Sequence, residues 1–503
     1  MSRVTRPQGR SDSIKRNAVL SLTNRLMSAV FTAILTLYLV RALGPSGYGT
    51  FALAVSVGTL AALLADFGIA SSASRFVAEH RGEPDAQFAV IARAMRLKLT
   101  LAAVVSTAVF VLAAPIADAY GVQGLEWPLR GAAIALAGQT LMLFVTGLLG
   151  ALGRVGANSP VILSESALEA TASIGLVVLG TGATGATFGR TIGYTFGGIL
   201  AIVVLSRVIR RSALGRPPHV EGQGRRIAAY AFPVFITNGV FTLFSQIDVM
   251  LLGAMLGPVA VGVFQAPIRF ITMLMYAGTA LGAGVGPTLA GRVKNIRAFQ
   301  SAIRYLIIGQ ALLLAPVIVW ADPIVNVLLG PSYEDSVPVL RAMAPFVFFS
   351  GLGPFLSTSV NYLGGAGRRV PIAIAALAAN AAVDLVLIPP LGVLGCAIGT
   401  DVGYLIYVPA HFWICRRALG LPLRPVAVTL ARCALATIAM GLVLAVAGTA
   451  DVSAPALVLG AAAGLLAYFG TLVATGELKL SEVEAVAGAI RRRVTGLKRR
   501  FTR

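Results

Sequence analysis

The sequence predicts an all-α, polytopic membrane protein with fourteen transmembrane helices. Two six-helix lobes in parallel repeat are expected, followed by two extra C-terminal helices. Hydrophobic residues make up 57% of the 503 residues, charged residues make up 12%, and the mean hydropathy is +0.84. A soluble chain carries about 25% charged residues, so this composition cannot cover a water-exposed surface. The other two observations are the alternation of basic residues along the chain and an internal repeat.

The fourteen spans are apolar runs of the length that crosses a bilayer, about 18–25 residues. Polar breaks separate these runs. We place them at 17–41, 48–70, 97–117, 129–152, 158–180, 185–206, 228–256, 260–288, 303–321, 338–362, 370–390, 394–414, 426–448 and 454–474.

The distribution of Lys and Arg supports this count and gives an orientation. With a cytoplasmic N-terminus, the outer segments would be 42–47, 118–128, 181–184, 257–259, 322–337, 391–393 and 449–453. None of them contains Lys or Arg, whereas the inner segments and tails hold 34 of the 41 basic residues. Because basic loops remain in the cytoplasm, both termini are expected there.

The net charge of +21 follows from the same distribution. Basic cytoplasmic loops and a basic tail face anionic membrane lipids. A nucleic-acid binder would carry its basic residues on a folded polar domain, and no such domain is present, so nucleic acid is excluded as a partner. The three histidines are scattered and the three cysteines avoid the outer segments. We therefore expect no metal site, no cofactor and no disulfide framework.

Three motifs recur in order at nearly constant offsets. The Gly44-Pro45 break with Gly49 recurs 213 residues later at Gly257-Pro258 with Gly262, and "LGALGR" (149–154) recurs as "LGGAGR" (363–368). Glycines spaced by four residues at 185–193 recur at 395–403, and this spacing predicts close helix packing. Six helices per copy give both copies the same direction in the membrane. The expected parts are an N-lobe (1–206), a basic cytoplasmic linker (207–227), a C-lobe (228–425), two helices (426–475) and a basic amphipathic cytoplasmic tail (476–503).

Polar side chains line one face of three expected helices. They recur at steps of three or four residues, which places them on a stripe. This pattern predicts a hydrated cleft between the lobes, while hydrogen bonding between helices is the alternative explanation for the short polar residues. The expected cavity residues are Asn24, Arg25, Asn238, Gln265, Arg269 and Tyr276.

Charged side chains inside spans cost several kcal/mol unless they have a partner or a cavity. Arg25 and Arg269 lie on the polar stripes, and arginines in a hydrated cleft suit an anionic phosphate group, which they bind bidentately. Glu165 and Glu169 are one helical turn apart, so one of them either carries a proton or pairs with an arginine. The residues expected to couple transport to an ion, or to form structural ion pairs, are Asp66, Glu165, Glu169, Arg190, Asp248 and Asp401.

Two segments carry a family resemblance. "RALGPSGYGTFALAVSVGTLAALLADFGIASSASRFVAE" (41–79) and "QIDVMLLGAMLGPVAVGVFQAPIRF" (246–270) resemble the starts of the two lobes in bacterial polysaccharide transporters, the oligosaccharide-lipid flippases. The similarity extends across the first twelve helices. The same superfamily contains lipid II flippases and multidrug and toxin extrusion antiporters.

The resemblance implies a transporter of the bacterial cytoplasmic membrane, not an enzyme. Two lobes would rock around a central cavity and move a lipid-linked oligosaccharide of the undecaprenyl-pyrophosphate type outward. Arg25 and Arg269 match the cavity arginines of lipid II flippases, and the helices at 426–474 match the pair that holds the lipid tail. This chain has fewer cavity arginines than a lipid II carrier. The expected partners are a polysaccharide polymerase or glycosyltransferases, and the transporter is expected to be a monomer.

Two other functions remain open. A cation-coupled antiporter of small amphipathic solutes would use an acid inside the membrane, and Asp248 on the seventh helix provides one. A polytopic glycan polymerase or ligase would build its site from a long outer loop. The longest outer segment, 322–337, holds only an adjacent Glu334 and Asp335 beside Pro338, which is typical of a turn.

Overall fold

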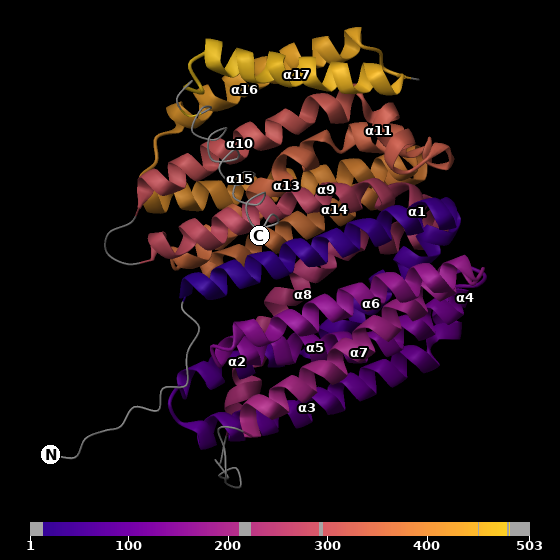
Figure 1. Ribbon diagram of the computed structural model, residues 1–503, viewed down its shortest axis with the longest axis vertical. Coiled ribbons are helices and arrows are strands. Elements are labelled where there is room, and N and C mark those ends of the chain that lie inside the picture. The colour runs from indigo at the N-terminus through magenta and orange to yellow at the C-terminus, as the bar shows by residue number, and fades with distance from the viewer. Residues whose placement is uncertain (1–13, 211–222, 291–294, 451, 480–481, 483–503) are drawn as a thin grey trace, which may run out of the picture. The chain divides into compact units, whose positions relative to one another are not determined.

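The regular structure of the described residues is entirely helical. The computed structural model describes residues 14–210, 223–290, 295–450, 452–479 and 482 (Figure 1). Most of the expected basic linker and tail lies outside them. The first unit begins with α1 (Ile14–Asp66), α2 (Ile69–Glu79), α3 (Pro84–Val111), α4 (Ala113–Tyr120), α5 (Glu126–Ala151), η1 (Val155–Ala157), α6 (Asn158–Val178), α7 (Gly182–Arg210) and α8 (Gln223–Leu256). The remaining elements are α9 (Pro258–Val285), η2 (Gly286–Leu289), α10 (Ile296–Val319), α11 (Ala321–Leu328), η3 (Pro331–Tyr333), α12 (Ser336–Ala342), α13 (Ala344–Tyr362), η4 (Ala366–Arg368), α14 (Arg369–Leu391), α15 (Val393–Leu419), α16 (Leu423–Val446) and α17 (Ala454–Ala474).

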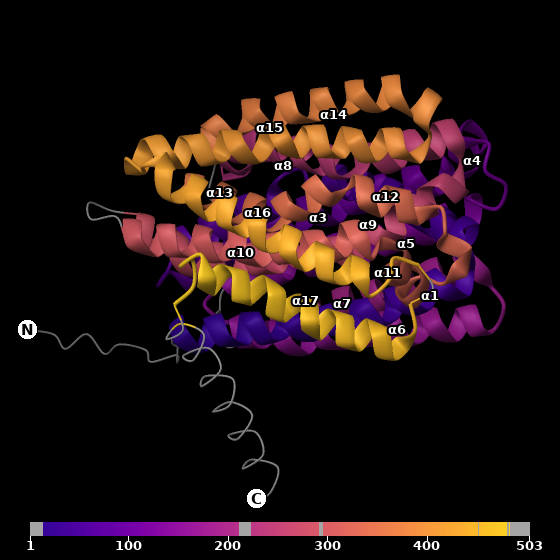
Figure 2. The ribbon, with the colours of Figure 1, turned by 90° about the horizontal axis from the view of Figure 1, so that it is seen from above.

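The chain forms two compact units. The first consists of residues 1–270 and 373–403, and the second of residues 271–372 and 404–503. In the first unit, buried side chains such as Phe76, Phe144 and Leu148 form a core among α2, α3 and α5. In the second, α16 and α17 lie side by side (Figures 1 and 2). The predicted division into lobes at 1–206 and 228–425 remains a prediction.

The chain is a multi-pass membrane protein. Twelve described helices are long and apolar enough to cross a membrane, or thirteen if α12 and α13, which are bent by 55° relative to each other, form one span. The prediction of an all-helical, polytopic fold is therefore confirmed. The expected run 338–362 proves to be this bent pair. Short helices α4 and α11 extend into the expected outer segments 118–128 and 322–337.

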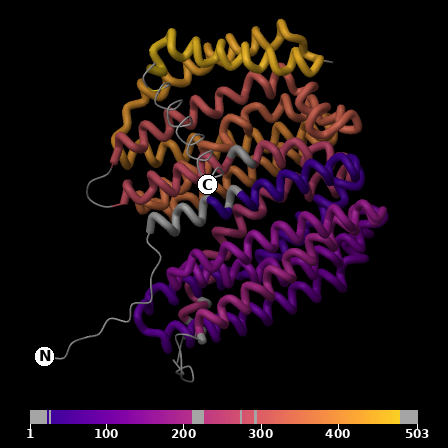
Figure 3. The backbone as a smooth tube through the Cα atoms, viewed as in Figure 1, coloured from indigo at the N-terminus to yellow at the C-terminus, as the bar shows by residue number. Residues whose placement is uncertain are grey.

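A glycine–proline break divides α1. The 53 residues would extend about 80 Å as a straight helix, more than twice the roughly 30 Å hydrocarbon core of a bilayer. At Gly44 the backbone leaves the helical region, with φ of 63° and ψ of −179°. Glycine adopts this conformation without strain, and the following Pro45 has no N–H to continue the ladder. Two helical segments therefore meet at this kink within α1, and the indigo tube in Figure 3 changes direction along this element. Gly257, at the repeated break, also has a positive φ of 81°.

The repeated glycine faces pack as predicted. A Cβ atom on Gly193 of α7 would lie 2.7 Å from the Cβ atom of Glu169 on α6. At the equivalent position of the second copy, a Cβ atom on Gly403 of α15 would lie 3.2 Å from that of Asn380 on α14. Both pairs of helices therefore approach closely, and they bring the polar side chains of α6 and α14 into the interior.

A network of charges joins the end of α17 to α10 and α16 within the second unit. Glu477 is 4% exposed and accepts hydrogen bonds from Arg304 Nε (2.9 Å), Arg432 Nη1 (3.0 Å) and Thr429 Oγ1 (2.8 Å). Glu482 accepts a hydrogen bond from Arg304 Nη1 at 3.1 Å. This network fixes the segment that follows the last membrane helix.

The same network makes the stability of the protein depend on pH. The Arg304 hydrogen bonds hold the pKa of Glu482 at about 2. Burial raises the pKa of Glu477, but the hydrogen bonds from Arg304, Thr429 and Arg432 outweigh burial and bring it below its usual value. A carboxyl group with a lowered pKa stabilises the folded state above its unfolded pKa of about 4.3, and this contribution is lost as the pH falls toward the folded pKa.

We expect Glu477→Gln to lower the melting temperature of the purified protein at pH 7. The difference from the wild type should shrink between about pH 5 and pH 2, because the wild-type carboxylate is then protonated as well. Thermal unfolding followed across this pH range measures both effects. The control is Glu334→Gln, a change at an exposed glutamate. A difference that persists unchanged at pH 2 would contradict the ionic role of Glu477.

Candidate functional site

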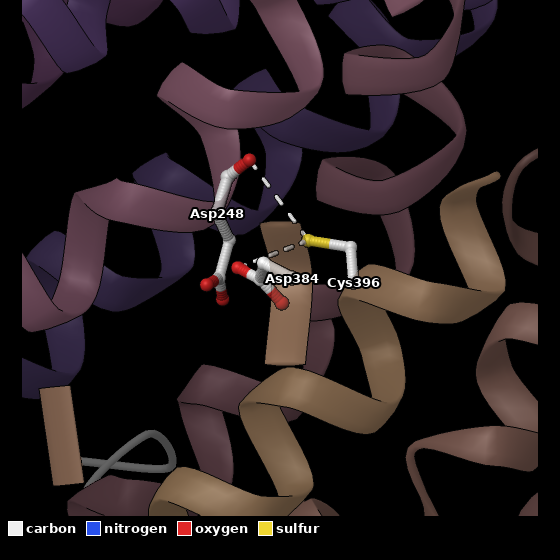
Figure 4. Close-up of side chains that lie close together, drawn as sticks. All are labelled: Asp248, Asp384 and Cys396. Atoms are coloured by element: carbon white, nitrogen blue, oxygen red, sulfur yellow. Dashed lines mark hydrogen bonds between the residues drawn. The ribbon is translucent and has the colours of Figure 1, made fainter. Parts of the chain in front are cut away.

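Three helices of the first unit place a group of buried polar side chains together. Asp248 lies on α8, Asp384 on α14 and Cys396 on α15, and one potential ligand atom from each lies within 4.8 Å of the others (Figure 4). Thr400, one turn after Cys396, donates a hydrogen bond from Oγ1 to Asp248 Oδ2 at 2.6 Å. Asn380 lies one turn before Asp384 on α14. The glycine face of α15 makes this possible, because a side chain at Gly399 would overlap the Asp384 carboxylate.

Several polar atoms of this group make no hydrogen bond of good geometry. They are Asp248 Oδ1, Asp384 Oδ1 and both amide atoms of Asn380. The Asp248 carboxyl group nevertheless lies close to that of Asp384 and to the Asn380 amide, so a proton or an ion placed between them would join them. Asp384 and Asn380 are 0% exposed, and Asp248 is 8% exposed. The thiol of Cys396 makes only weak contacts, at 3.9 Å to the Asp248 carbonyl and 4.0 Å to Asp384 Oδ2 (Figure 4). Buried polar atoms without partners are costly, so this group is suited to receiving a ligand.

The charge and donor atoms of the group indicate which ligand would fit. Among the described side chains, no Lys or Arg forms an ion pair with Asp248 or Asp384. Two ionised carboxylates inside a membrane, with no counter-charge, are strongly unfavourable. A proton or a small hard cation would offset them, because carboxylate, amide and hydroxyl oxygens are the ligands that such cations prefer.

The equivalent helices of the first repeat carry a different group. Glu169 on α6 forms an ion pair with Arg190 on α7 at 2.6 Å, and Arg190 Nη2 donates a hydrogen bond to the Tyr194 hydroxyl at 3.3 Å. Glu165 is 4% exposed and accepts a hydrogen bond from Ser166 at 3.0 Å. The expected pairing of one of these glutamates with an arginine is thus present. Here an arginine compensates the buried acid, whereas the acids of the second copy have no such partner among the described residues.

Asp66 also forms an ion pair. Its Oδ1 accepts a hydrogen bond from Lys98 Nζ at 2.7 Å, and the ammonium group donates a second one to the Ala65 carbonyl. The Lys98 side chain is 1% exposed. Asp66 and Lys98 therefore join the end of α1 to α3. Asp401 lies half-buried on α15, next to Thr400.

The expected cavity residues are distributed as follows. Asn24 is buried and donates a hydrogen bond to Ser159 on α6 at 2.9 Å. Gln265 is buried and Arg269 half-buried on α9, while Asn238 on α8 is exposed. Tyr276, also exposed, belongs to the second unit. The side chain of Arg25 lies outside the described residues, and the cavity at these six residues remains a prediction.

Sequence reasoning missed Asn380, Asp384, Cys396 and Thr400 as site residues. The repeat contained a signal for two of them. Asn380 lies at the position equivalent to Glu169, and Thr400 at the position equivalent to Arg190, at offsets of 211 and 210 residues. A comparison of the polar residues in the two copies would have selected α14 and α15 as the helices of a site. It would not have shown that Asp248 on α8 reaches the same point, because that contact depends on tertiary packing.

A comparison with known families now identifies the chain. Residues 14–290, more than half of the sequence, match the family described as "Polysaccharide biosynthesis protein". The chain belongs to this family. Its matched region covers α1 to α9, including Asp248 and Arg269. The resemblance on the two quoted segments is therefore confirmed.

One curated relative is consistent with this family. A 160-residue stretch is 27% identical to the protein described as "Putative O-antigen transporter" of Escherichia coli (strain K12) and covers 31% of this chain and 38% of that protein. The match thus spans less than half the length of that curated relative.

Two solved structures show the fold. The Lipid II flippase MurJ in an inward closed conformation superposes with a TM-score of 0.70 at 14% identity, covering 90% of this chain and 97% of that one. An inward-facing multidrug resistance MATE family transporter of the MOP superfamily superposes with a TM-score of 0.60 at 16% identity, covering 80% of this chain and 98% of that one. At these identities the likeness concerns the fold alone.

Proposed function

We propose that this protein translocates a lipid-linked oligosaccharide of the undecaprenyl-pyrophosphate type across the bacterial cytoplasmic membrane, by alternating access. The observation that carries the proposal is the family match over residues 14–290. The similarity to an O-antigen transporter and the fold of a lipid II flippase support it, since both names describe transport of a glycan or of its lipid carrier. The cargo then enters the synthesis of a cell-surface polysaccharide.

The proposal includes the predicted topology. Counting α12 and α13 as one span gives thirteen, and dividing α1 at Gly44 gives fourteen. In the proposed topology both termini lie in the cytoplasm, on the same side as the basic inner loops. The lobes are 1–206 and 228–425, and the chain acts as a monomer beside a polysaccharide polymerase or glycosyltransferases of the same pathway.

Arg269 binds the cargo phosphate in this proposal, together with Arg25. Arg269 is half-buried on a helix that is apolar enough to cross the membrane. A guanidinium group in a site with little water binds a pyrophosphate bidentately, and its charge persists at any physiological pH. Asn238, Gln265 and Tyr276 would contact the neighbouring sugar.

Asp248 and Asp384 supply the driving force. They bind a proton or a sodium ion, and the gradient of that ion returns the transporter to the conformation that receives cargo. The close approach of these two buried carboxyl groups, neither of which pairs with a described Lys or Arg, supports this assignment. Glu165, Glu169 and Arg190 form a structural network in this scheme.

An antiporter of small amphipathic solutes is the second candidate. The buried acids Asp248 and Asp384 and the likeness to a MATE family transporter favour it. A buried carboxylate pair serves either cargo, so the cargo itself has to be tested. A polytopic glycan polymerase or ligase has no comparable support, because the named relatives are transporters and flippases.

Reconstitution distinguishes the two candidates. The protein is placed in liposomes that carry a fluorescent undecaprenyl-pyrophosphate-linked oligosaccharide in both leaflets, and a membrane-impermeant quencher reports crossing. We expect crossing that depends on an imposed sodium or proton gradient. In matched liposomes, ethidium uptake tests the antiporter. Absence of lipid crossing together with gradient-driven ethidium transport would replace the proposed function with the second candidate.

A further inference from the structure

The two glycine–proline breaks of the repeat pack against each other. A Cβ atom added to Gly49 would overlap the Pro258 carbonyl, and one added to Gly262 would overlap the Pro45 carbonyl. Each glycine thus lies directly on the backbone of the other break. Only glycine allows two backbones to approach this closely. We call this contact between 45–49 and 258–262 the seam.

The seam continues along α1 and α8. Leu53, one turn after Gly49, is 0% exposed, and its side chain fills the space in front of Gly253. No side chain larger than hydrogen fits at position 253 while Leu53 is in place, because an added Cβ atom would lie 2.8 Å from the leucine Cδ1. The seam therefore excludes water along more than one helical turn.

A polar contact bridges the two sides of the seam. Tyr48, which precedes Gly49, is 2% exposed, and its hydroxyl lies within the electrostatic reach of the Arg269 guanidinium group, which can donate a hydrogen bond to it. Arg269 lies seven residues, or two turns, after Gly262 on α9. The guanidinium group of the proposed cargo site is therefore also a contact that holds α1 against α9.

We propose that Tyr48 is a positioning residue that holds Arg269 in a latch across an outer gate, and that binding of the cargo phosphate by Arg269 releases this latch. The inference rests on the proposed function, which assigns the phosphate to Arg269 and the seam to the outer face. A phosphate oxygen carries a full charge and binds a guanidinium more strongly than a neutral hydroxyl does. An arginine that turns to bind a pyrophosphate leaves Tyr48, and the seam loses this polar contact.

The latch explains how cargo would drive outward opening. A ligand shifts a conformational equilibrium only through its different affinity for the two states. With Tyr48 as a competitor for Arg269, the closed state binds phosphate less well than the open one. Loading from the inside then favours the opening of the seam, and the empty transporter keeps it closed.

The test measures how accessible the seam is. A cysteine introduced by Leu53→Cys is labelled with a maleimide in the purified full-length protein, and labelling at residue 53 is quantified by mass spectrometry. The native cysteines are buried, and mass spectrometry quantifies their labelling separately from that of residue 53. Labelling is compared in the otherwise unchanged protein and with Tyr48→Phe, Gly49→Ala or Arg269→Gln added. Inorganic pyrophosphate is the probe, with sulfate as the control anion. Leu129→Cys, equally buried on α5, is the control position.

Tyr48→Phe keeps the ring and removes the hydroxyl, so we expect about a tenfold faster labelling at residue 53, the change that loss of one hydrogen bond to a charged group produces. Gly49→Ala should raise the labelling rate by a similar factor, because the added methyl group pushes the two breaks apart. Pyrophosphate, but not sulfate, should raise labelling in the protein with Tyr48 and Arg269 intact. With Arg269→Gln, labelling should be fast from the start and insensitive to pyrophosphate.

Three outcomes overturn the inference. Unchanged labelling with Tyr48→Phe excludes the latch. Faster labelling that pyrophosphate does not reproduce excludes the link to cargo. Faster labelling at both residue 53 and residue 129 shows that Tyr48 supports the fold as a whole. A pyrophosphate response in a protein that moves no lipid-linked oligosaccharide would refute the proposed cargo and leave the latch in place.

Discussion

Arg269→Ala is expected to abolish transport of the lipid-linked oligosaccharide while the protein still inserts and folds. The variant removes the bidentate, charge-assisted contact with the pyrophosphate, and two such hydrogen bonds together account for roughly a hundredfold or more in rate. Arg25→Ala should have the same effect. The liposome crossing assay measures the loss, and the yield of folded protein in detergent shows whether insertion is preserved.

Arg269→Lys is the matched variant. Lysine keeps the positive charge, but its point-like ammonium group cannot form the paired hydrogen bonds of a guanidinium, so partial activity is expected. Normal crossing by both alanine variants would eliminate the phosphate-binding role of Arg25 and Arg269. Equal activity of Arg269→Lys and the wild type would reduce that role to simple electrostatic attraction.

Asp384→Asn is expected to remove the dependence of transport on the ion gradient. The side chain keeps its shape but can no longer form a charged ligand or carry a proton, and Asp248→Asn should act alike. The gradient-driven rate should fall at least about tenfold, corresponding to loss of about 1.4 kcal/mol or more in coupling. Initial rates measured with and without a sodium or proton gradient test this.

The melting temperatures of two variants distinguish the Asp248–Asp384 site from the Glu169–Arg190 pair in the first repeat. Asp384→Asn relieves repulsion between two buried acids, so its melting temperature should equal or exceed that of the wild type. Glu169→Gln leaves Arg190 buried without its ion-pair partner, so it should lower the melting temperature. The opposite result would contradict this assignment. If Glu169→Gln were stable but lost the dependence of transport on the ion gradient, and Asp384→Asn kept that dependence, the coupling site would lie in the first repeat.

The fold was largely predictable because its signals are local. Apolar run length, basic loops and the repeated glycines depend on short stretches of sequence, and each identified the all-helical membrane architecture. The bend between α12 and α13 was not predicted, because the apolar run at 338–362 continues through it, although Pro345 in the first turn of α13 is a local signal for the start of a new helix. The break at Gly44 was predicted, because glycine followed by proline ends a helix by its own backbone chemistry.

The candidate site was predictable only in part. Asp248 and the pair Glu169 and Arg190 stood out because charges inside spans are rare. Which acids meet, however, is decided by packing between helices far apart in sequence, such as Asp248 with Asp384, 136 positions later. Lys98 was counted among the cytoplasmic basic residues, yet it is buried against Asp66. From the sequence alone, a charged residue at the edge of an apolar run can be assigned equally well to a cytoplasmic loop or to a buried ion pair.

The mutual fit of the two breaks has the geometry of an isologous contact, the kind that joins identical subunits about a twofold axis. Here one polypeptide supplies both surfaces, as a gene duplication followed by fusion would leave them. The two copies are therefore constrained as a matched pair. A Cβ atom at position 49 would meet backbone atoms of Pro258, and one at position 262 would meet backbone atoms of Pro45, so no change of side chain at 258 or 45 makes room for it. Glycine should therefore be required at both positions, and a substitution at one should not be rescued by a change in the other break.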